Sequence, residues 1–285
     1  MGRRTVRAVL LVLLVCLAAA GCTGDPPSRS RRQPPPLQLD ASVTQNRFDE
    51  GTVDLLAGVT NNSNRDIRVS RATIAWDVLG FPSVRLRGEA IHPGQTAAFR
   101  IAFGAPRCGT SSRTGPVLVA DIDGRTRRLR LRVEDPGLLV RLWAEACRRQ
   151  RLDRVASVAL RVASRTTRVA GEDYLPADLV LRRRPGSAAR VRVVDLDGSV
   201  LIDLLPRHGR RSLPAVLAPG HQRLDVPLLF GSAHRCDGHA RGQSSQTFLF
   251  SAYVRVGSRP AQRVVLPLSP AEQERAIGVV DRDCR

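Results

Sequence analysis

The feature that most constrains the fold of this chain is a short motif that occurs twice. The first copy reads Phe-Gly-Ala-Pro-Arg-Cys (residues 103–108), and the second reads Phe-Gly-Ser-Ala-His-Arg-Cys (residues 230–236). Each copy lies between a Pro-Gly turn and a Ser-Ser-x-Thr motif, and each is followed further along by one more cysteine, Cys147 or Cys284. A chain of 285 residues has room for two ordinary domains. The repeat therefore predicts one domain, duplicated.

Composition sets the character of the cores and of the surface. Hydrophobic residues make up 42% of the chain but aromatic residues only 4%, so the cores must consist mainly of Val, Leu, Ile and Ala. The net charge of +19 comes entirely from arginine, because the chain contains no lysine. Complete replacement of lysine indicates a GC-rich coding sequence, which favours Arg and Ala codons. A basic surface nevertheless attracts anionic lipid, wall polymer or nucleic acid.

The N-terminus has the organisation of an export signal. Arg3, Arg4 and Arg7 form a positive region before an apolar segment, residues 8–19, which is too short to span a bilayer comfortably and ends in small residues. The segment Leu-Ala-Ala-Ala-Gly-Cys (residues 17–22) resembles the lipobox of bacterial lipoproteins.

The resemblance implies that residues 1–22 are a lipoprotein signal peptide. The thiol of Cys22 would receive a diacylglycerol, and Cys22 would become the mature N-terminus, anchored by lipid at the extracytoplasmic face of the cell membrane. The alternative is a plain secretory signal cut after an Ala-x-Ala site, and the Arg3-Arg4 pair is compatible with twin-arginine export. Export from the cytoplasm removes nucleic acid from the expected partners.

Residues 23–36 are predicted to be a tether. They are rich in Pro, Ser and Arg, a composition that cannot bury a core and favours extended polyproline conformations. Arg29, Arg31 and Arg32 would lie near the membrane, where each basic residue adds about 1 kcal/mol of attraction to anionic lipid. A solvated linker without this role explains the composition equally well.

The first repeat, residues 37–147, has the pattern of an antiparallel sandwich. Apolar residues alternate with arginines, as in Phe99-Arg100-Ile101 and Leu129-Arg130-Leu131, so apolar groups lie on one sheet face and guanidinium groups on the other. Turn-forming pairs such as Pro93-Gly94 and Asp123-Gly124 separate the runs. We therefore expect a mainly β chain with an immunoglobulin-like β-sandwich in each repeat. Residues 148–154 would link the first repeat to the second, residues 155–284.

Both repeats are predicted to end in a short helix. In the first, Asp135 caps the helix, Pro136 occupies its first position and Cys147 closes it. In the second, Ser269-Pro270-Ala271-Glu272 is a capping box with proline at the first helical position, and Cys284 follows. This parallel is independent of the motif that reveals the repeat, and it supports the duplication.

The duplication also predicts how the cysteines pair. Of six cysteines, Cys16 leaves with the signal peptide and Cys22 carries the lipid, so four remain and allow three pairings. An exported protein meets an oxidising compartment, where disulfides form and persist. In the chain-entropy model each bond stabilises its repeat by roughly 3–4 kcal/mol. One bond within each repeat gives the predicted pairs, Cys108–Cys147 and Cys236–Cys284.

Two clusters of metal-ligand residue types have simpler interpretations. His234, Cys236, Asp237 and His239 suggest zinc, but Cys236 matches Cys108, which has no histidine nearby, and a disulfide sulfur is not a thiolate ligand. Asp-x-Asp-Gly at residues 121–124 and 195–198 resembles the start of a calcium loop without its remaining ligands, whereas Asp-Gly is the usual hairpin pair. We expect no metal and no cofactor.

Catalytic motifs are absent from the sequence, which has no Gly-x-Ser-x-Gly, no Ser-x-x-Lys, no His-Glu-x-x-His and no phosphate loop. We therefore expect no catalytic residues. Among the arginine runs, Arg182-Arg183-Arg184 is the anion-binding candidate; it has no interleaved aromatic residues for base stacking, and a solvated strand face is the alternative.

These features predict a lipid-anchored lipoprotein that acts as a non-catalytic binding or assembly module at the cell envelope. Its expected partners are the membrane and an anionic lipid, a wall polymer or an envelope protein. The alternative is an extracytoplasmic hydrolase whose site is assembled from distant residues.

Overall fold

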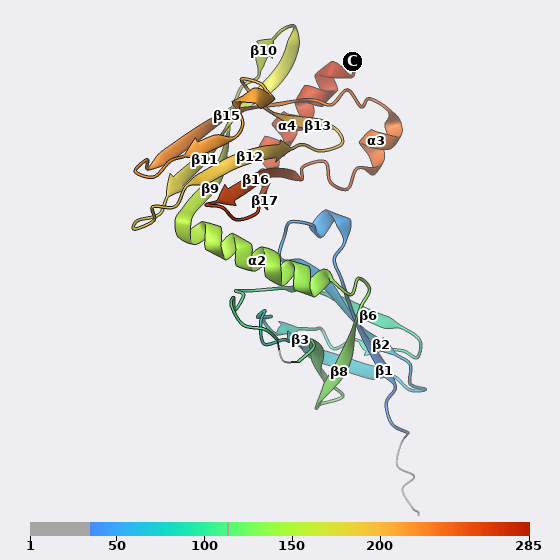
Figure 1. Cartoon of the computed structure of the whole chain (residues 1–285). Coiled ribbons are helices and arrows are strands. Elements are labelled where there is room, and N and C mark those ends of the chain that lie inside the picture. Colours follow the sequence, from blue (N-terminus) through green and yellow to red (C-terminus); the bar gives the residue numbers. More distant parts are fainter. Residues whose placement is uncertain (1–34, 113) are drawn as a thin grey trace, which may run out of the picture. The chain divides into compact units, whose positions relative to one another are not determined.

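The structure is a computed structural model that describes residues 35–112 and 114–285. The signal peptide, Cys22 and most of the tether predicted from the sequence lie outside the described residues. The described chain is mainly β, with several antiparallel sheets (Figure 1). We call residues 39–133 the N-terminal β region and residues 156–283 the C-terminal β region. Within this part of the chain, no helix is long and apolar enough to cross a membrane.

The strands of the N-terminal β region form one sheet. They are β1 (Leu39–Thr44), β2 (Asp54–Asn61), β3 (Ile67–Ala75), β4 (Val84–Arg85), β5 (Ala90–Ile91), β6 (Thr96–Ala102), β7 (Val117–Ile122) and β8 (Arg125–Val133), with the 3-10 helix η1 (Arg47–Asp49) between β1 and β2. The order in the sheet is β4-β3-β7-β8-β1-β2-β6, and β5 also pairs with β3. β1 pairs with β8 in parallel and with β2 in antiparallel orientation, so it lies inside the sheet.

The C-terminal β region contains two sheets. The first has the order β10-β11-β15-β13, with β9 also paired to β11, and the second has the order β14-β12-β16-β17. The strands are β9 (Ala156–Val162), β10 (Thr167–Val169), β11 (Glu172–Arg183), β12 (Val191–Asp197), β13 (Ile202–Pro206), β14 (Ala215–Leu217), β15 (Arg223–Ser232), β16 (Phe250–Val256) and β17 (Gln262–Leu266). The α-helices of the described chain are α2 (Leu138–Val155), α3 (Gly238–Gln243) and α4 (Pro270–Asp283), and a second 3-10 helix, η2 (Arg210–Ser212), lies between β13 and β14.

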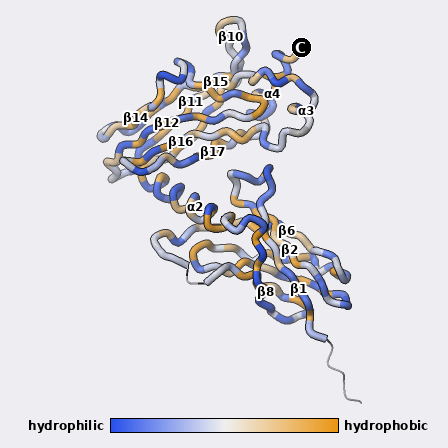
Figure 2. Tube along the Cα trace, turned by 45° about the vertical axis from the view of Figure 1, so that its right-hand side comes forward, coloured by the Kyte–Doolittle hydropathy of each residue, from blue (hydrophilic) through white to orange (hydrophobic). Residues whose placement is uncertain are grey.

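The alternation in the sequence decides which side chains enter the cores. In β6, Phe99 and Ile101 are buried while Arg100 between them is exposed, and in β8 Leu131 is buried between two exposed arginines. A strand turns successive side chains to opposite faces, so this pattern places arginine outside and aliphatic groups inside. Figure 2 shows the same pattern as hydrophobic stretches on the strands of both β regions, with hydrophilic stretches beside them.

One aromatic pair lies in the otherwise aliphatic core of the C-terminal β region. The rings of Phe230 and Phe250 meet edge to face, with centroids 4.9 Å apart and an interplanar angle of 74°. Gly231 follows Phe230 because a Cβ at this position would come within 2.6 Å of the Tyr174 ring. The Phe-Gly motif of the second repeat thus places one ring in the core and makes room for another ring on the opposite face.

Helix α2 begins later than the sequence predicts. The carboxylate of Asp135 accepts a hydrogen bond from the N–H of Gly137 at 3.0 Å and pairs with Arg141 at 2.6 Å. The chain therefore makes a turn at Asp135 and Pro136 before the helix starts at Leu138. Asp135 still lies beside the helix N-terminus, where a carboxylate is favourable, and its ion pair reaches Arg141 in the first turn.

Helix α2 also continues through residues 148–154, which we predicted to be a linker. Arg149 and Asp153 form an i,i+4 pair at 3.1 Å, a spacing that stabilises a helix surface. Leu152 is fully buried in the core of the C-terminal β region. A helical conformation of the linker is therefore favoured by packing that the charged sequence of this segment does not reveal.

Helix α4 has the predicted capping box. The carboxylate of Glu272 accepts hydrogen bonds from the hydroxyl and the backbone N–H of Ser269, both at 2.7 Å. These two hydrogen bonds hold the pKa of Glu272 below its usual range, and the bond from the hydroxyl has the larger effect. Pro270 follows at the first helical position, where its missing N–H leaves no hydrogen bond unmade.

The disulfides join the cysteines that the duplication pairs. The Cα atoms of Cys108 and Cys147 lie 5.6 Å apart, and those of Cys236 and Cys284 lie 5.4 Å apart. Cys147 belongs to α2, and Cys284 is the C-cap residue of α4. Each bond therefore ties a helix to the segment that follows a Phe-Gly motif.

We predict that each disulfide stabilises its own β region. Replacing Cys108 and Cys147 together by Ala should lower the protection of the N-terminal β region against hydrogen exchange, by up to about 4 kcal/mol, because the unfolded loop is no longer closed. The Cys236→Ala, Cys284→Ala chain is the matched control and should lower protection mainly in the C-terminal β region. Exchange measured by mass spectrometry separates the two regions, and the opposite distribution of protection would contradict the prediction.

Candidate functional site

The predicted anion-binding run, Arg182 to Arg184, does not act as a unit. Arg182 and Arg184 are exposed, but Arg183 between them is only 9% exposed. Neighbouring residues at the end of a strand point to opposite faces, so the three guanidinium groups cannot meet one ligand. Adjacency in sequence therefore does not bring these three guanidinium groups together in space.

Arg183 instead connects two loops of the C-terminal β region. Its five N–H donors all reach backbone carbonyl oxygens, so the guanidinium group has no donor left for a ligand. The first loop joins β11 to β12, and the second joins β14 to β15. The acceptors are Ser187 at 3.2 Å and Ala189 at 2.7 Å in the first loop, and Leu217 at 3.3 Å, Ala218 at 2.7 Å and His221 at 2.8 Å at the second.

Arg182 shares the outer face of the β9-β11-β15-β13 sheet with other arginines. Arg182 lies opposite Arg223 of β15 in the β11–β15 ladder. On the other side of β11, Arg161 of β9 lies opposite Asp178. Asp225 lies among these groups and forms an ion pair with Arg223 at 2.6 Å. The pKa of the Asp225 carboxyl lies below its usual range, mainly because of the hydrogen bond from Arg223 and to a smaller extent because of the charges of Arg161 and Arg182.

A depression of about 220 Å³ lies on this outer face. It lies where the flanking strands stop, because β9 ends at Val162 and β13 ends at Pro206. The two central strands carry prolines here, Pro176 in β11 and Pro227 in β15, which cannot donate to a neighbouring strand. The last ladder bonds run to the proline carbonyls, from Ala163 N–H to Pro176 and from Arg207 N–H to Pro227, both at 2.9 Å.

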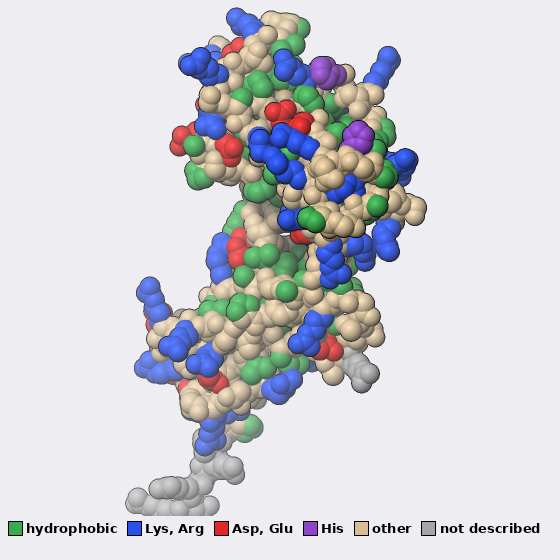
Figure 3. Space-filling model, turned by 90° about the vertical axis from the view of Figure 1, so that its left-hand side faces the viewer, with side chains coloured by type: hydrophobic (Ala, Val, Ile, Leu, Met, Phe, Trp, Pro, Cys, Tyr) green, Lys and Arg blue, Asp and Glu red, His purple; other side chains and the backbone are tan. Residues whose placement is uncertain are grey.

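Three charged side chains line this depression. Arg161 and Arg207 are exposed, and neither forms an ion pair with another residue in the part of the chain that the structure describes; Asp178 is the third. A guanidinium group without a carboxylate partner keeps its planar set of donors for a phosphate or carboxylate group. The depression can therefore hold a small anionic group between two arginines, with Asp178 as an acceptor for a hydroxyl on the same ligand. Figure 3 shows one face of the molecule, with arginine side chains spread over both β regions and acidic side chains between some of them.

A second cluster lies where the end of α4 meets β15. Asp283 Oδ2 accepts hydrogen bonds from the Ser232 hydroxyl at 2.6 Å and from His234 Nδ1 at 3.0 Å, and His234 Nε2 lies 3.9 Å from Glu172 Oε1. The pKa of Asp283 lies below its usual range, mainly because of the hydrogen bond from Ser232 and to a smaller extent because of the charge of His234. The serine donates to the carboxylate and not to the histidine, so the cluster lacks the nucleophile–base contact of a hydrolase.

The zinc candidate of the sequence is divided among other roles. Asp237 caps α3, because its carboxylate accepts from the N–H of Ala240 at 2.8 Å. Cys236 is bonded to Cys284, so its sulfur is not a thiolate, while His234 contacts Asp283 and His239 is exposed in α3.

The two Asp-x-Asp-Gly segments differ in structure. Asp123 and Gly124 both have positive φ, 50° and 73°, and form the two-residue turn between β7 and β8. Asp197 ends β12, and the chain then crosses to β13 in the other sheet, so this copy is not a hairpin turn. Its carboxylate instead accepts from the hydroxyl of Tyr253 at 3.3 Å.

Sequence reasoning missed the depression lined by Arg161 and Arg207. These arginines are far apart in sequence: Arg161 lies in an alternating strand, and Arg207 lies in the turn that follows β13. A usable signal was the pair of prolines, Pro176 and Pro227, inside stretches that otherwise read as strands. Proline within a central strand marks a place where the ladder is interrupted.

No protein family matches the sequence, and no curated protein matches it. The crystal structure of the CsuC–CsuE chaperone–tip adhesion subunit pre-assembly complex, from archaic chaperone-usher Csu pili of Acinetobacter baumannii, has 9% identity, covers 81% of this chain and 98% of that chain, and has a TM-score of 0.22. The Amycolatopsis orientalis exo-chitosanase CsxA has 11% identity and a TM-score of 0.18; the match covers 82% of this chain and 26% of the enzyme's chain. The BSP domain of a biofilm associated protein has 9% identity, covers 83% of this chain and 59% of that chain, and has a TM-score of 0.22. At these TM-scores the likenesses carry no argument for fold or function.

We predict that Arg183 is required for stability and not for binding. Arg183→Lys should lower the free energy of unfolding by roughly 2–4 kcal/mol, because lysine has three donors for the five carbonyl oxygens that the buried guanidinium group serves. Arg182→Lys is the matched control on the exposed face and should change it by less than about 0.5 kcal/mol. Urea unfolding followed by circular dichroism compares the two, and equal effects would show that Arg183 does not hold the loops.

Proposed function

We propose that this chain is a bacterial lipoprotein, exported on residues 1–22 and held at the extracytoplasmic face of the cell membrane by lipid on Cys22. It works as a non-catalytic binding or assembly module of the cell envelope. After the tether, residues 23–36, we infer two immunoglobulin-like β-sandwich repeats, residues 37–147 and 155–284. A disulfide ties a helix in each repeat, and the first of these helices continues to Val155. The placement of one disulfide after each Phe-Gly motif supports this duplication.

One observation carries the proposed binding role. In the depression on the outer face of the β9-β11-β15-β13 sheet, Arg161 and Arg207 have no ion-pair partner among the described residues, although many other arginines of the surface do. Two free guanidinium groups around a recess favour a phosphate-bearing partner. A phospholipid headgroup and a phosphate-bearing wall polymer share this chemistry, and both occur where an exported lipoprotein would be.

The second candidate function is an extracytoplasmic hydrolase, and the contacts of Ser232, His234 and Asp283 are the observation that favours it. These residues bring a hydroxyl, an imidazole and a carboxylate together. A hydrolase of this kind would need the serine to turn from Asp283 to His234 before it could be deprotonated. Hydrolysis of an ester, peptide or glycan that His234→Ala abolishes would replace the binding proposal.

The lipid anchor is tested at the mature N-terminus. We expect mass spectrometry of the protein from its own membrane to show a first peptide that begins at Cys22 and carries a diacylglyceryl adduct, because the lipobox-like segment directs that modification. The Cys22→Ser chain should lose the adduct and leave the membrane fraction. A wild-type mature chain that begins elsewhere and is free in the medium would contradict the prediction.

The binding role is tested with chain lacking residues 1–22. It should sediment with anionic liposomes and not with neutral ones, and increasing salt should weaken binding because exposed charges are screened. Arg161→Ala with Arg207→Ala should weaken binding by about 2 kcal/mol, or roughly 30-fold, at about 1 kcal/mol for each basic residue. A parallel measurement with a soluble phosphate-bearing wall polymer distinguishes the two sources of phosphate.

A matched control separates a site from general charge. Arg190→Ala with Arg259→Ala removes the same charge from two other exposed arginines that have no ion pair with a described residue, and should cost much less binding. Equal losses in the two double variants would mean that net charge, and not the depression, attracts the partner. Binding without salt dependence, or equal binding to neutral liposomes, would remove the anionic partner altogether.

A further inference from the structure

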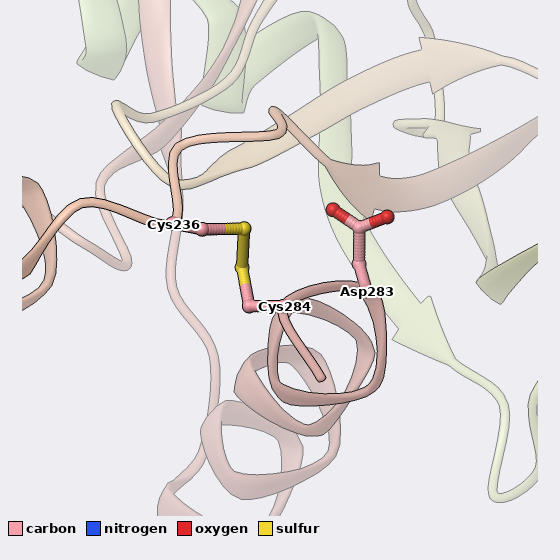
Figure 4. Close-up of side chains that lie close together, drawn as sticks. All are labelled: Cys236, Asp283 and Cys284. Atoms are coloured by element: carbon pink, nitrogen blue, oxygen red, sulfur yellow. A yellow bond between two sulfur atoms is a disulfide. The ribbon is translucent and has the colours of Figure 1, made fainter.

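The carboxylate of Asp283 lies beside the Cys236–Cys284 disulfide. The sulfur atoms of Cys236 and Cys284 and a carboxylate oxygen of Asp283 all lie within 4.8 Å of one another, and Figure 4 shows the three side chains together at the end of α4. Cys236 belongs to the segment after β15, and Asp283 and Cys284 are consecutive residues at the helix end. The disulfide and the carboxylate thus bring together groups from two elements at one point.

The carboxylate of Asp283 is held in place by two neighbours. Its Oδ2 atom accepts the hydrogen bonds from Ser232 and His234, while Oδ1 accepts none from the described residues. A carboxylate bound at one oxygen in this way is oriented and still has a free oxygen to offer a cation.

We propose that reduction of the Cys236–Cys284 disulfide creates a metal site, with zinc as the preferred ion. The ligands are the two thiolates and the carboxylate of Asp283, and a water molecule completes the tetrahedron. Zinc binds thiolate sulfur at about 2.3 Å and carboxylate oxygen at about 2.0–2.2 Å, so small movements of these three side chains suffice. Paired thiolates select soft or borderline metal ions over magnesium and calcium.

The chemistry of the switch balances with a dithiol reductant. The dithiol transfers two electrons and two protons to the protein disulfide; the Cys236–Cys284 sulfur–sulfur bond breaks, and the reductant forms its own disulfide. Zinc then displaces the two thiol protons to solvent as its bonds to sulfur form. Asp283 needs no proton change, because its carboxylate is already the charged form that a metal binds.

The two disulfides of the chain differ in accessibility and in surroundings. Cys236 is exposed and Cys284 is half-buried, whereas Cys147 is only 8% exposed. Within residues 35–112 and 114–285, no group of three potential metal ligands includes Cys108 or Cys147. A reductant should therefore reach the second disulfide first, and only that disulfide should leave a metal site behind. The protein contains its own control.

Metal binding would preserve the contact that the disulfide makes. The ion would bridge the segment after β15 to the end of α4, the same two points that the covalent bond joins. The C-terminal helix would then remain docked when the disulfide is broken and zinc is present.

The test uses the mature chain with Cys22→Ser, in two forms that each keep one disulfide. One form carries Cys108→Ala and Cys147→Ala, and the other carries Cys236→Ala and Cys284→Ala. Each is reduced with a phosphine, desalted without oxygen, and titrated with zinc and with cobalt as a spectroscopic probe. We expect the form with Cys236 and Cys284 to bind one ion with a thiolate-to-cobalt charge-transfer band, and the other form to bind none. The oxidised chains should also bind none.

Asp283→Asn distinguishes the proposed site from a simple pair of thiols. It keeps the size of the side chain and should weaken zinc binding at least about tenfold. If reduction loosens α4, zinc should restore the protection of residues 270–283 against hydrogen exchange. Equal zinc binding by the two forms, unchanged affinity in Asp283→Asn, or no restored protection in a loosened helix would overturn the proposal.

Discussion

A covalent bond between a helix and the segment after a Phe-Gly motif closes each β region of this chain. The closure matters because the cores are nearly all aliphatic, with one aromatic pair, Phe230 and Phe250, in the C-terminal β region. Aliphatic side chains gain free energy mainly in proportion to the apolar area they bury. A helix that packs on such a core through a few residues, as α4 does through Ala276, Val279 and Val280, is held more firmly when its end is bonded to the adjacent loop.

The second constraint is that arginine must serve every cationic role. On the surface it pairs with carboxylates, as Arg141 does with Asp135, and in helix α2 it stabilises the surface through Arg149 and Asp153. Arg183 is used for its number of donors, because its one planar, buried group donates to five backbone carbonyl oxygens of two loops. Lysine could not replace arginine there, because its ammonium group has only three donors and lacks the planar geometry of the guanidinium group.

The sequence predicted what depends on short-range pattern and on the repeat. The mainly β character, the turn at Asp123-Gly124, the capping box at Ser269 and the pairing of the cysteines each follow from residues whose spacing has a direct geometric meaning. The sequence could not predict what depends on distant partners. The charged segment at residues 148–154 becomes helical because Leu152 enters a core, and Arg183 leaves the surface because two loops converge on it.

The position of β1 inside its sheet has a mechanical consequence. The described chain enters the sheet through β1, which is hydrogen-bonded to β2 on one side and to β8 on the other. These bonds lie across the strand, so a pull applied at Leu39 along the strand axis loads both ladders at the same time and not one bond after another. A module drawn outward by a partner while its N-terminal segment is held at a membrane would bear that force in shear, along the strand that is supported on both sides.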